Sequence, residues 1–92
     1  MDIPQTFKAM GLTVKVERPE TIIINGESYT GAWDNSELTV EIKRGLPYEC
    51  AEATFFHEIL HIADYNDALN EDQTEQISRS LYAIFKDNGW LK

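Results

Sequence analysis

The chain contains a single cysteine, Cys50, only three prolines and no long hydrophobic run. One cysteine excludes an internal disulfide, and because nothing at the N-terminus resembles a signal peptide, we expect a protein of the reducing cytoplasm. The longest apolar stretch lies near residues 59–63 and is interrupted by His61, so it is too short to cross a membrane. We therefore expect a soluble protein with no membrane partner.

Positive charge is also scarce. The chain has 8 Lys and Arg against 16 Asp and Glu, a formal net charge of −8. The resulting field repels phosphate groups, which argues against nucleic acid as a partner. With 92 residues, of which 42% are hydrophobic, the chain should form a single domain, residues 1–92, around one small core. A bound metal would help to stabilise a domain of this size.

Apolar and polar residues alternate in the first half of the chain, as they do in strands that bury one face. Asn25-Gly26 supplies the positive φ angles of a type I′ turn between two such segments. Residues 4–10, which precede Gly11, favour one or two helical turns. The turns predict a small, mostly antiparallel sheet of about four strands. The alternating segments are 12–17, 21–24, 27–33 and 37–43.

The second half of the chain favours helices. Residues 47–65 contain no glycine, and their apolar side chains fall nearly all round a helical wheel, so this helix should be central and buried. Asn70 and Gln73 form a capping-box pattern that begins a second helix, which Asn88-Gly89 can close. A sheet followed by two long helices is an α+β fold. The expected buried face of the second helix consists of Ile77, Leu81, Tyr82, Ile84 and Phe85.

Both histidines of the chain lie in the stretch TFFHEILHIAD, residues 54–64. On a helix, positions i and i+4 project from one side on successive turns, so His57 and His61 can reach one metal ion. Glu58 lies about 100° round the helix from His57, from where its carboxylate can approach a metal-bound water. A catalytic zinc takes three protein ligands and a water, so the chain must offer a third ligand.

Three acidic residues compete for that place. Asp64 lies one turn beyond His61. Three ligands on successive turns of one helix would give a zinc ion poor tetrahedral coordination, so Asp64 is better placed to hydrogen-bond a histidine. Asp67 has the spacing at which the metzincin group of zinc peptidases places a third ligand, but Asp64 stands where that group has a glycine. Glu75, on the border of the apolar face of the second helix, can point across the helical hairpin. We favour Glu75 over Asp67.

The sequence resembles the gluzincin metallopeptidases, in which an HExxH helix is joined by a glutamate from the following helix. It is most similar to the minimal zincin-like proteins of phages and prophages. The matching segments are HEILHIAD and NEDQTEQISRSLYAIFKDNGW. The resemblance is strong over residues 54–90 and looser over the sheet. It implies a zincin-like fold with one zinc ion, located in the host cytoplasm if the chain is phage-encoded.

By this resemblance His57, His61 and Glu75 are the zinc ligands, and Glu58 is the general base. An edge strand that pairs with an extended substrate would lie within YTGAWDNSELTVEI. Arg79 stands where larger gluzincins have an aspartate four residues after the ligand glutamate. The subdomain that stabilises the oxyanion in those enzymes has no counterpart here. The candidates to replace it are Tyr48, Tyr65 and Tyr82.

We therefore expect a zinc-dependent peptidase in which Glu58 activates a zinc-bound water to attack a peptide or protein substrate. Two alternatives stay open. A zinc ion that only holds the helices together would make the chain a zinc-stabilised protein-binding module. A chain without metal would be an inactive zincin-like interaction protein, whose thermal stability a chelator would leave unchanged.

Overall fold

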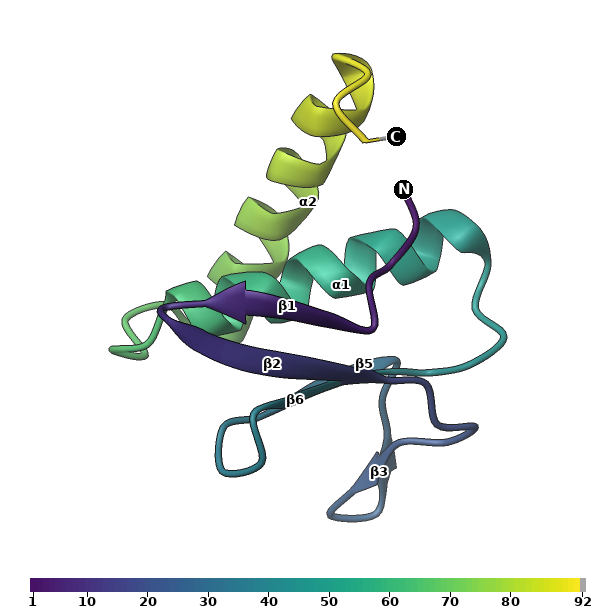
Figure 1. Cartoon of the computed structure of the whole chain (residues 1–92), viewed down its shortest axis with the longest axis vertical. Coiled ribbons are helices and arrows are strands. Elements are labelled where there is room, and N and C mark those ends of the chain that lie inside the picture. The colour runs from purple at the N-terminus through teal and green to yellow at the C-terminus, as the bar shows by residue number, and fades with distance from the viewer. Residues whose placement is uncertain (92) are drawn as a thin grey trace.

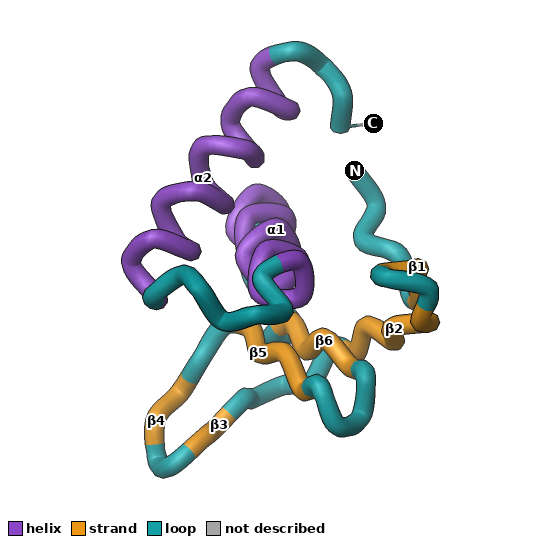
Figure 2. Tube along the Cα trace, turned by 90° about the vertical axis from the view of Figure 1, so that its left-hand side faces the viewer, coloured by secondary structure: helices purple, strands orange, loops and turns teal. Residues whose placement is uncertain are grey.

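The computed structural model describes residues 1–91 and has the expected α+β architecture. Helix α1 covers one face of a four-stranded sheet (Figure 1). Figure 2 shows α1 nearly end-on, between the sheet and helix α2. No helix in this range is long and apolar enough to cross a membrane. The elements are β1 Thr6–Ala9, β2 Leu12–Glu17, β3 Ile23–Ile24, β4 Glu27–Ser28, β5 Gly31–Asp34, β6 Thr39–Ile42, α1 Tyr48–Ala63 and α2 Glu71–Asp87.

The four-stranded sheet is mixed, with the strand order β1-β2-β6-β5. Its two outer pairings are antiparallel, as predicted, whereas β2 and β6 pair in parallel at the centre. No local turn joins a parallel pair, so the sequence carries no short-range signal for it. The order leaves β5 at an edge. This result identifies which part of YTGAWDNSELTVEI forms the edge strand: it is Gly31–Asp34.

The N-terminal segment is a strand, so the prediction of helical turns over residues 4–10 is wrong. β1 pairs with β2 through a two-residue turn in which Met10 and Gly11 both have positive φ, 53° and 79°. Methionine is an unusual residue for this conformation, which hid the hairpin from sequence inspection. The strand is favoured because Phe7 points to the core and packs edge-to-face on Phe55, with the ring centroids 5.5 Å apart.

The predicted Asn25-Gly26 hairpin is confirmed, with φ angles of 52° and 83° at its two turn residues. Its strands β3 and β4 form a separate two-stranded ribbon and do not join the four-stranded sheet. Figure 2 shows this ribbon projecting from the molecule on the side where β5 ends the sheet. Its apolar residues Ile23 and Ile24 are exposed. The ribbon therefore forms a wall beside the sheet edge.

Helix α1 is central, as predicted, and the core lies between it and the sheet. Its other side contacts α2 through Phe56, whose ring centroid lies 5.5 Å from that of Tyr82 and 5.6 Å from that of Phe85. The buried apolar side chains of the core cluster come from both layers, which fixes α1 on the sheet. They are Val14, Val40, Ile42, Ala51, Phe55 and Ile62.

Both ends of α2 agree with the predictions. The side chain of Asn70 accepts a hydrogen bond from Gln73 N at 2.8 Å, and Gln73 Oε1 accepts one from Asn70 N at 2.9 Å, which completes the capping box. At the other end Gly89 has φ 67° and donates to Lys86 O, while Trp90 N donates to Phe85 O. These two bonds form a Schellman cap.

The predicted buried face of α2 is wrong in part. Ile77, Leu81 and Ile84 are exposed, and the fully buried residues of the helix are Thr74 and Ser78. Their hydroxyl groups are satisfied within α2, on Asn70 O at 3.0 Å and Glu75 O at 3.1 Å, so burial leaves no unpaired polar group. Small side chains at this contact let the first half of α2 approach α1 closely.

Candidate metal centre

The two histidines lie together on the side of α1 that faces α2. Their Nε2 atoms are 3.1 Å apart, and their ring centroids are separated by 4.8 Å. The side chain of His57 is 12% exposed and that of His61 is 30% exposed, so the pair is partly shielded from water. The prediction that positions i and i+4 bring both imidazoles to one point is confirmed.

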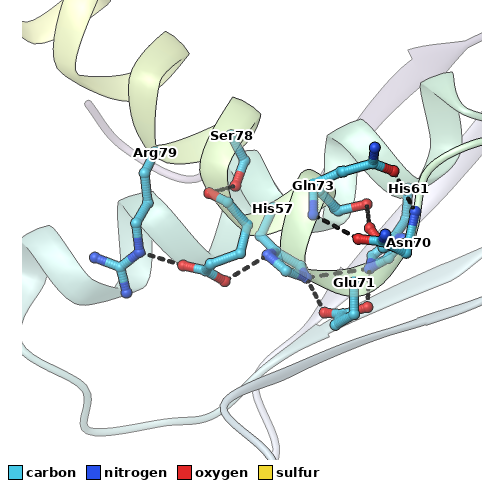
Figure 3. A network of polar contacts seen from close by, with 9 residues as sticks. His57, His61, Asn70, Glu71, Gln73, Ser78 and Arg79 are labelled. Carbon is cyan, nitrogen blue, oxygen red and sulfur yellow. Dashed lines mark hydrogen bonds and ion pairs between the residues drawn. The ribbon is translucent and has the colours of Figure 1, made fainter.

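The start of α2 adds a carboxylate to this pair. One oxygen of Glu71 lies 2.7 Å from His57 Nε2 and the other lies 3.3 Å from His61 Nε2, as Figure 3 shows. The capping box at Asn70 fixes where the helix begins, and the small residue Thr74 lets that first turn approach α1. His57, His61 and Glu71 each offer one atom, and these atoms lie within 4.8 Å of one another.

The separations suit a zinc ion. Tetrahedral ligands at 2.0 to 2.1 Å from zinc lie about 3.3 Å from each other. The two Nε2 atoms are 3.1 Å apart, and each has a different oxygen of Glu71 beside it, at 2.7 Å from His57 and 3.3 Å from His61. Two imidazole nitrogens and a carboxylate oxygen form a donor set that zinc accepts. Because the Glu71 side chain is 70% exposed, one side of the group opens to solvent, which leaves room for a water ligand.

Glu75, the predicted third ligand, lies one turn further along α2 and contacts the other nitrogen of His57. Its Oε2 atom is 2.9 Å from His57 Nδ1, and its Oε1 atom pairs with Arg79. His57 Nδ1 is buried, and its contact with Glu75 does not have hydrogen-bond geometry. One of the two side chains must therefore rotate slightly to place a proton between them. A carboxylate on Nδ1 holds the ring with Nε2 free for a metal. The structure thus brings Glu71, rather than Glu75, to both Nε2 atoms.

The two aspartates considered for the site lie apart from it. The carboxylate of Asp64 accepts hydrogen bonds from Ala68 N at 2.9 Å and Leu69 N at 3.0 Å, so it holds the loop between the helices and does not support a histidine. Asp67 is exposed in the same loop, with φ 52°. It is not among the three residues whose ligand atoms converge.

Glu58 is the buried acid of the site, with 5% of its surface exposed. A Cβ atom added to Gly31 of β5 would lie 2.9 Å from Glu58 Oε2, so the carboxylate lies against the bare backbone of the edge strand. Burial raises the pKa of Glu58 to about 7, and the negative charges of Glu71 and Glu75 act in the same direction, against the opposing effect of His57. A carboxylate with a pKa near neutrality is suited to accept a proton.

The raised pKa of Glu58 predicts a pH-dependent stability for the metal-free protein. The folded protein holds this proton up to about pH 7, whereas in the unfolded chain Glu58 has its ordinary pKa of 4.5 and has lost the proton by then. The folded state therefore binds more protons between these pH values, and the free energy of unfolding falls as pH rises through them, by about 3 kcal/mol for this group. Urea denaturation with a chelator present, at pH 5 and pH 8, measures the effect.

The matched variant for this measurement is Glu58→Gln, which cannot titrate. We expect it to be more stable than the wild type at pH 8, with a smaller difference at pH 5. Added zinc should reduce the difference, because a nearby cation favours the ionised carboxylate. A gap between the variant and the wild type that does not change with pH would contradict the assignment.

Two of the three tyrosines proposed for the oxyanion are engaged elsewhere. The hydroxyl of Tyr82 donates to Glu52 at 2.8 Å, and that of Tyr48 donates to a main-chain carbonyl. Tyr65 is exposed in the groove that contains the histidines. Tyr29, which follows the β3–β4 ribbon, lines the same groove and was missed because it reads as a strand residue. The hydroxyl of Tyr29 donates to Glu27 at 3.2 Å, so Tyr65 is the better candidate of the two.

Sequence reasoning also missed Glu71 and Gly31. Glu71 has the position of an acidic residue that the helix dipole favours in a first turn, although its place four residues before Glu75 puts both carboxylates on one helix face. Gly31 gave no signal, because the need for a glycine comes from α1 packing against β5, which local sequence does not encode.

Comparisons of the chain with protein-family models, with curated proteins and with solved structures gave no match. The likeness to gluzincins therefore stays a prediction from the motif. The convergence of His57, His61 and Glu71 is independent of that likeness.

Proposed function

We propose that the chain is a zinc-dependent peptidase. The observation that carries the proposal is the position of Glu58: a buried carboxylate with a raised pKa lies one residue from His57 and against the free edge strand β5. A structural zinc site needs no such group, because burying an ionisable side chain beside the metal costs stability. A proton acceptor beside both the metal group and a peptide-binding edge is what hydrolysis requires.

Each residue has a role in this proposal. His57, His61 and Glu71 would hold the ion, and Glu75, itself paired with Arg79, would orient the His57 ring. Zinc held there would polarise a substrate carbonyl and lower the pKa of water. Glu58 accepts a proton from the attacking water and returns it to the leaving nitrogen.

The edge strand supplies a place for the substrate backbone. β5 has β6 as its only neighbour in the four-stranded sheet of residues 1–91, so its outer backbone groups are free to pair with an extended chain. Gly31, beside Glu58, is on this strand. A peptide added to β5 would therefore pass the proton acceptor.

The test uses protein stripped of metal with a chelator and then reconstituted with one equivalent of zinc. Each form is incubated with a mixture of unstructured peptides, and new termini are identified by mass spectrometry. We expect cleavage by the zinc form only, and none by His61→Ala, whose side chain is partly exposed so that the fold should survive. Thermal unfolding of His61→Ala checks that it is folded.

A second candidate function has one observation in its favour. The converging residues come from both helices, so a bound ion would tie α1 to the first half of α2, where the buried residues of α2 are the small Thr74 and Ser78. Such an ion could be purely structural, in a module that binds another protein. One zinc per chain with no cleavage of any peptide would establish this alternative and overturn the peptidase proposal. Failure to bind zinc would overturn both.

A further inference from the structure

The histidines and Glu58 lie in a groove of about 1510 Å³ that is larger than the site itself. Ile24 and Tyr29, from the β3–β4 ribbon and the segment after it, contribute to one part of the lining, and Glu71 and Glu75 of α2 to another. Figure 2 shows α2 above and the ribbon below the sheet edge formed by β5. Small-molecule pockets have volumes of about 300 to 1,000 Å³, so this groove suits a longer occupant.

The lining of the groove is strongly acidic. It contains six carboxyl groups, and Arg79 is the one basic residue among the described residues that line it. Arg79 is already paired with Glu75, and Glu49 is paired with Lys86, which is not among the lining residues. A bound divalent ion would leave the lining negative, and the whole chain carries a net charge of −8. The acidic residues of the lining are Glu49, Glu58, Asp64, Asp67, Glu71 and Glu75.

The groove also has exposed apolar walls. Large hydrophobic side chains that gather on an exposed surface often mark a binding site. Here they come from the β1–β2 turn and the start of β2, from the β3–β4 ribbon and the residue after it, and from the loop after α1. They are Met10, Leu12, Ile24, Tyr29 and Tyr65, all exposed and all in the lining.

We infer that the groove selects an extended peptide segment that carries both basic and apolar side chains. The charge of the lining favours lysine and arginine and repels acidic residues, because like charges brought together in a binding site cost affinity. The apolar walls favour aliphatic or aromatic side chains at neighbouring positions. The inference rests on the proposed function, since it names the kind of chain that the edge strand and the metal centre would receive.

Binding is measured with zinc-loaded Glu58→Gln, so that the result does not depend on cleavage. Three labelled peptides of equal length are compared by fluorescence anisotropy: one of lysine and leucine, one of glutamate and leucine, and one of lysine and serine. We expect the lysine–leucine peptide to bind at least about tenfold more tightly than either of the others, with affinity falling as salt rises.

Two matched double variants locate the effect, and both are made in the Glu58→Gln background. Glu49→Gln with Asp67→Asn removes two exposed negative charges from the groove, of which that of Glu49 is paired with Lys86. Asparagine tolerates the positive φ of position 67. Glu20→Gln with Glu37→Gln removes two exposed charges outside it. We expect the first pair to weaken binding of the lysine–leucine peptide roughly three- to tenfold and the second to leave it unchanged.

Equal binding of the lysine–leucine and glutamate–leucine peptides, or equal effects of the two double variants, would overturn the inference. Neither result would affect the proposed peptidase activity, which the cleavage assay with wild-type protein tests separately. Selective binding without cleavage would instead retain the inference and overturn the peptidase proposal.

Discussion

Replacing Glu58 with glutamine should abolish peptide hydrolysis while the protein still binds one zinc ion per chain. The amide cannot accept a proton, and proton transfer by a positioned side chain contributes about 10²- to 10⁴-fold to rate. His57, His61 and Glu71 are unchanged in this variant, so zinc binding should persist. The measurements are kcat/KM on a cleaved peptide and zinc content by elemental analysis of the same sample.

The matched control is Glu52→Gln, on the same helix. Glu52 is buried like Glu58, with 3% of its surface exposed, but it bonds to Tyr82 and to the α-amino group of Met1 and is not among the groove residues. Losing these bonds should destabilise the fold without changing kcat/KM of the folded protein. A Glu58→Gln variant as active as the wild type would exclude Glu58 as the general base. Equal losses of activity in both variants would show that the effect is structural.

The parts of the site that depend on one helix were predictable from sequence. The spacing of His57 and His61 sets their common direction, and the pairing of Asn70 with Gln73 sets where α2 begins, because both follow from local backbone geometry. The same holds for the Asn25-Gly26 turn, whose residue types supply the positive φ angles.

The parts that depend on contacts between elements were not predictable. Hydrophobicity assigned Ile77, Leu81 and Ile84 to the core, but the structure buries Thr74 and Ser78 in the helix contact. A helix with small residues on one side can approach its neighbour more closely there, and hydroxyl groups bonded within their own helix remove the cost of burial. That close approach decides which carboxylate lies at the two Nε2 atoms, while the other contacts His57 Nδ1. Local pattern alone therefore could not separate Glu71 from Glu75.

The second large effect is expected from adding one methyl group to the edge strand, in Gly31→Ala. The new Cβ atom would lie 2.5 Å from Thr54 Cγ2 and 2.9 Å from Glu58 Oε2. Both distances are too short, so α1 must move away from β5 or the Glu58 carboxylate must turn aside. Overpacking of this kind costs about 1 to 3 kcal/mol in stability, and a displacement of about 1 Å at a catalytic group can reduce the rate about 10²-fold. Urea denaturation and kcat/KM measure the two effects.

A second substitution separates the two contacts of the added methyl group. Thr54→Ser removes Thr54 Cγ2 and should by itself change stability and activity little. In the Gly31→Ala, Thr54→Ser double variant the shorter contact is gone and the contact with Glu58 Oε2 remains. We therefore expect the double variant to regain most of the lost stability while kcat/KM stays low and zinc content stays at one ion per chain. Recovery of activity together with stability would show that Gly31 serves only the packing of α1 on the sheet. Low activity in a stable protein would instead show that position 31 must lack a side chain to leave room for the Glu58 carboxylate.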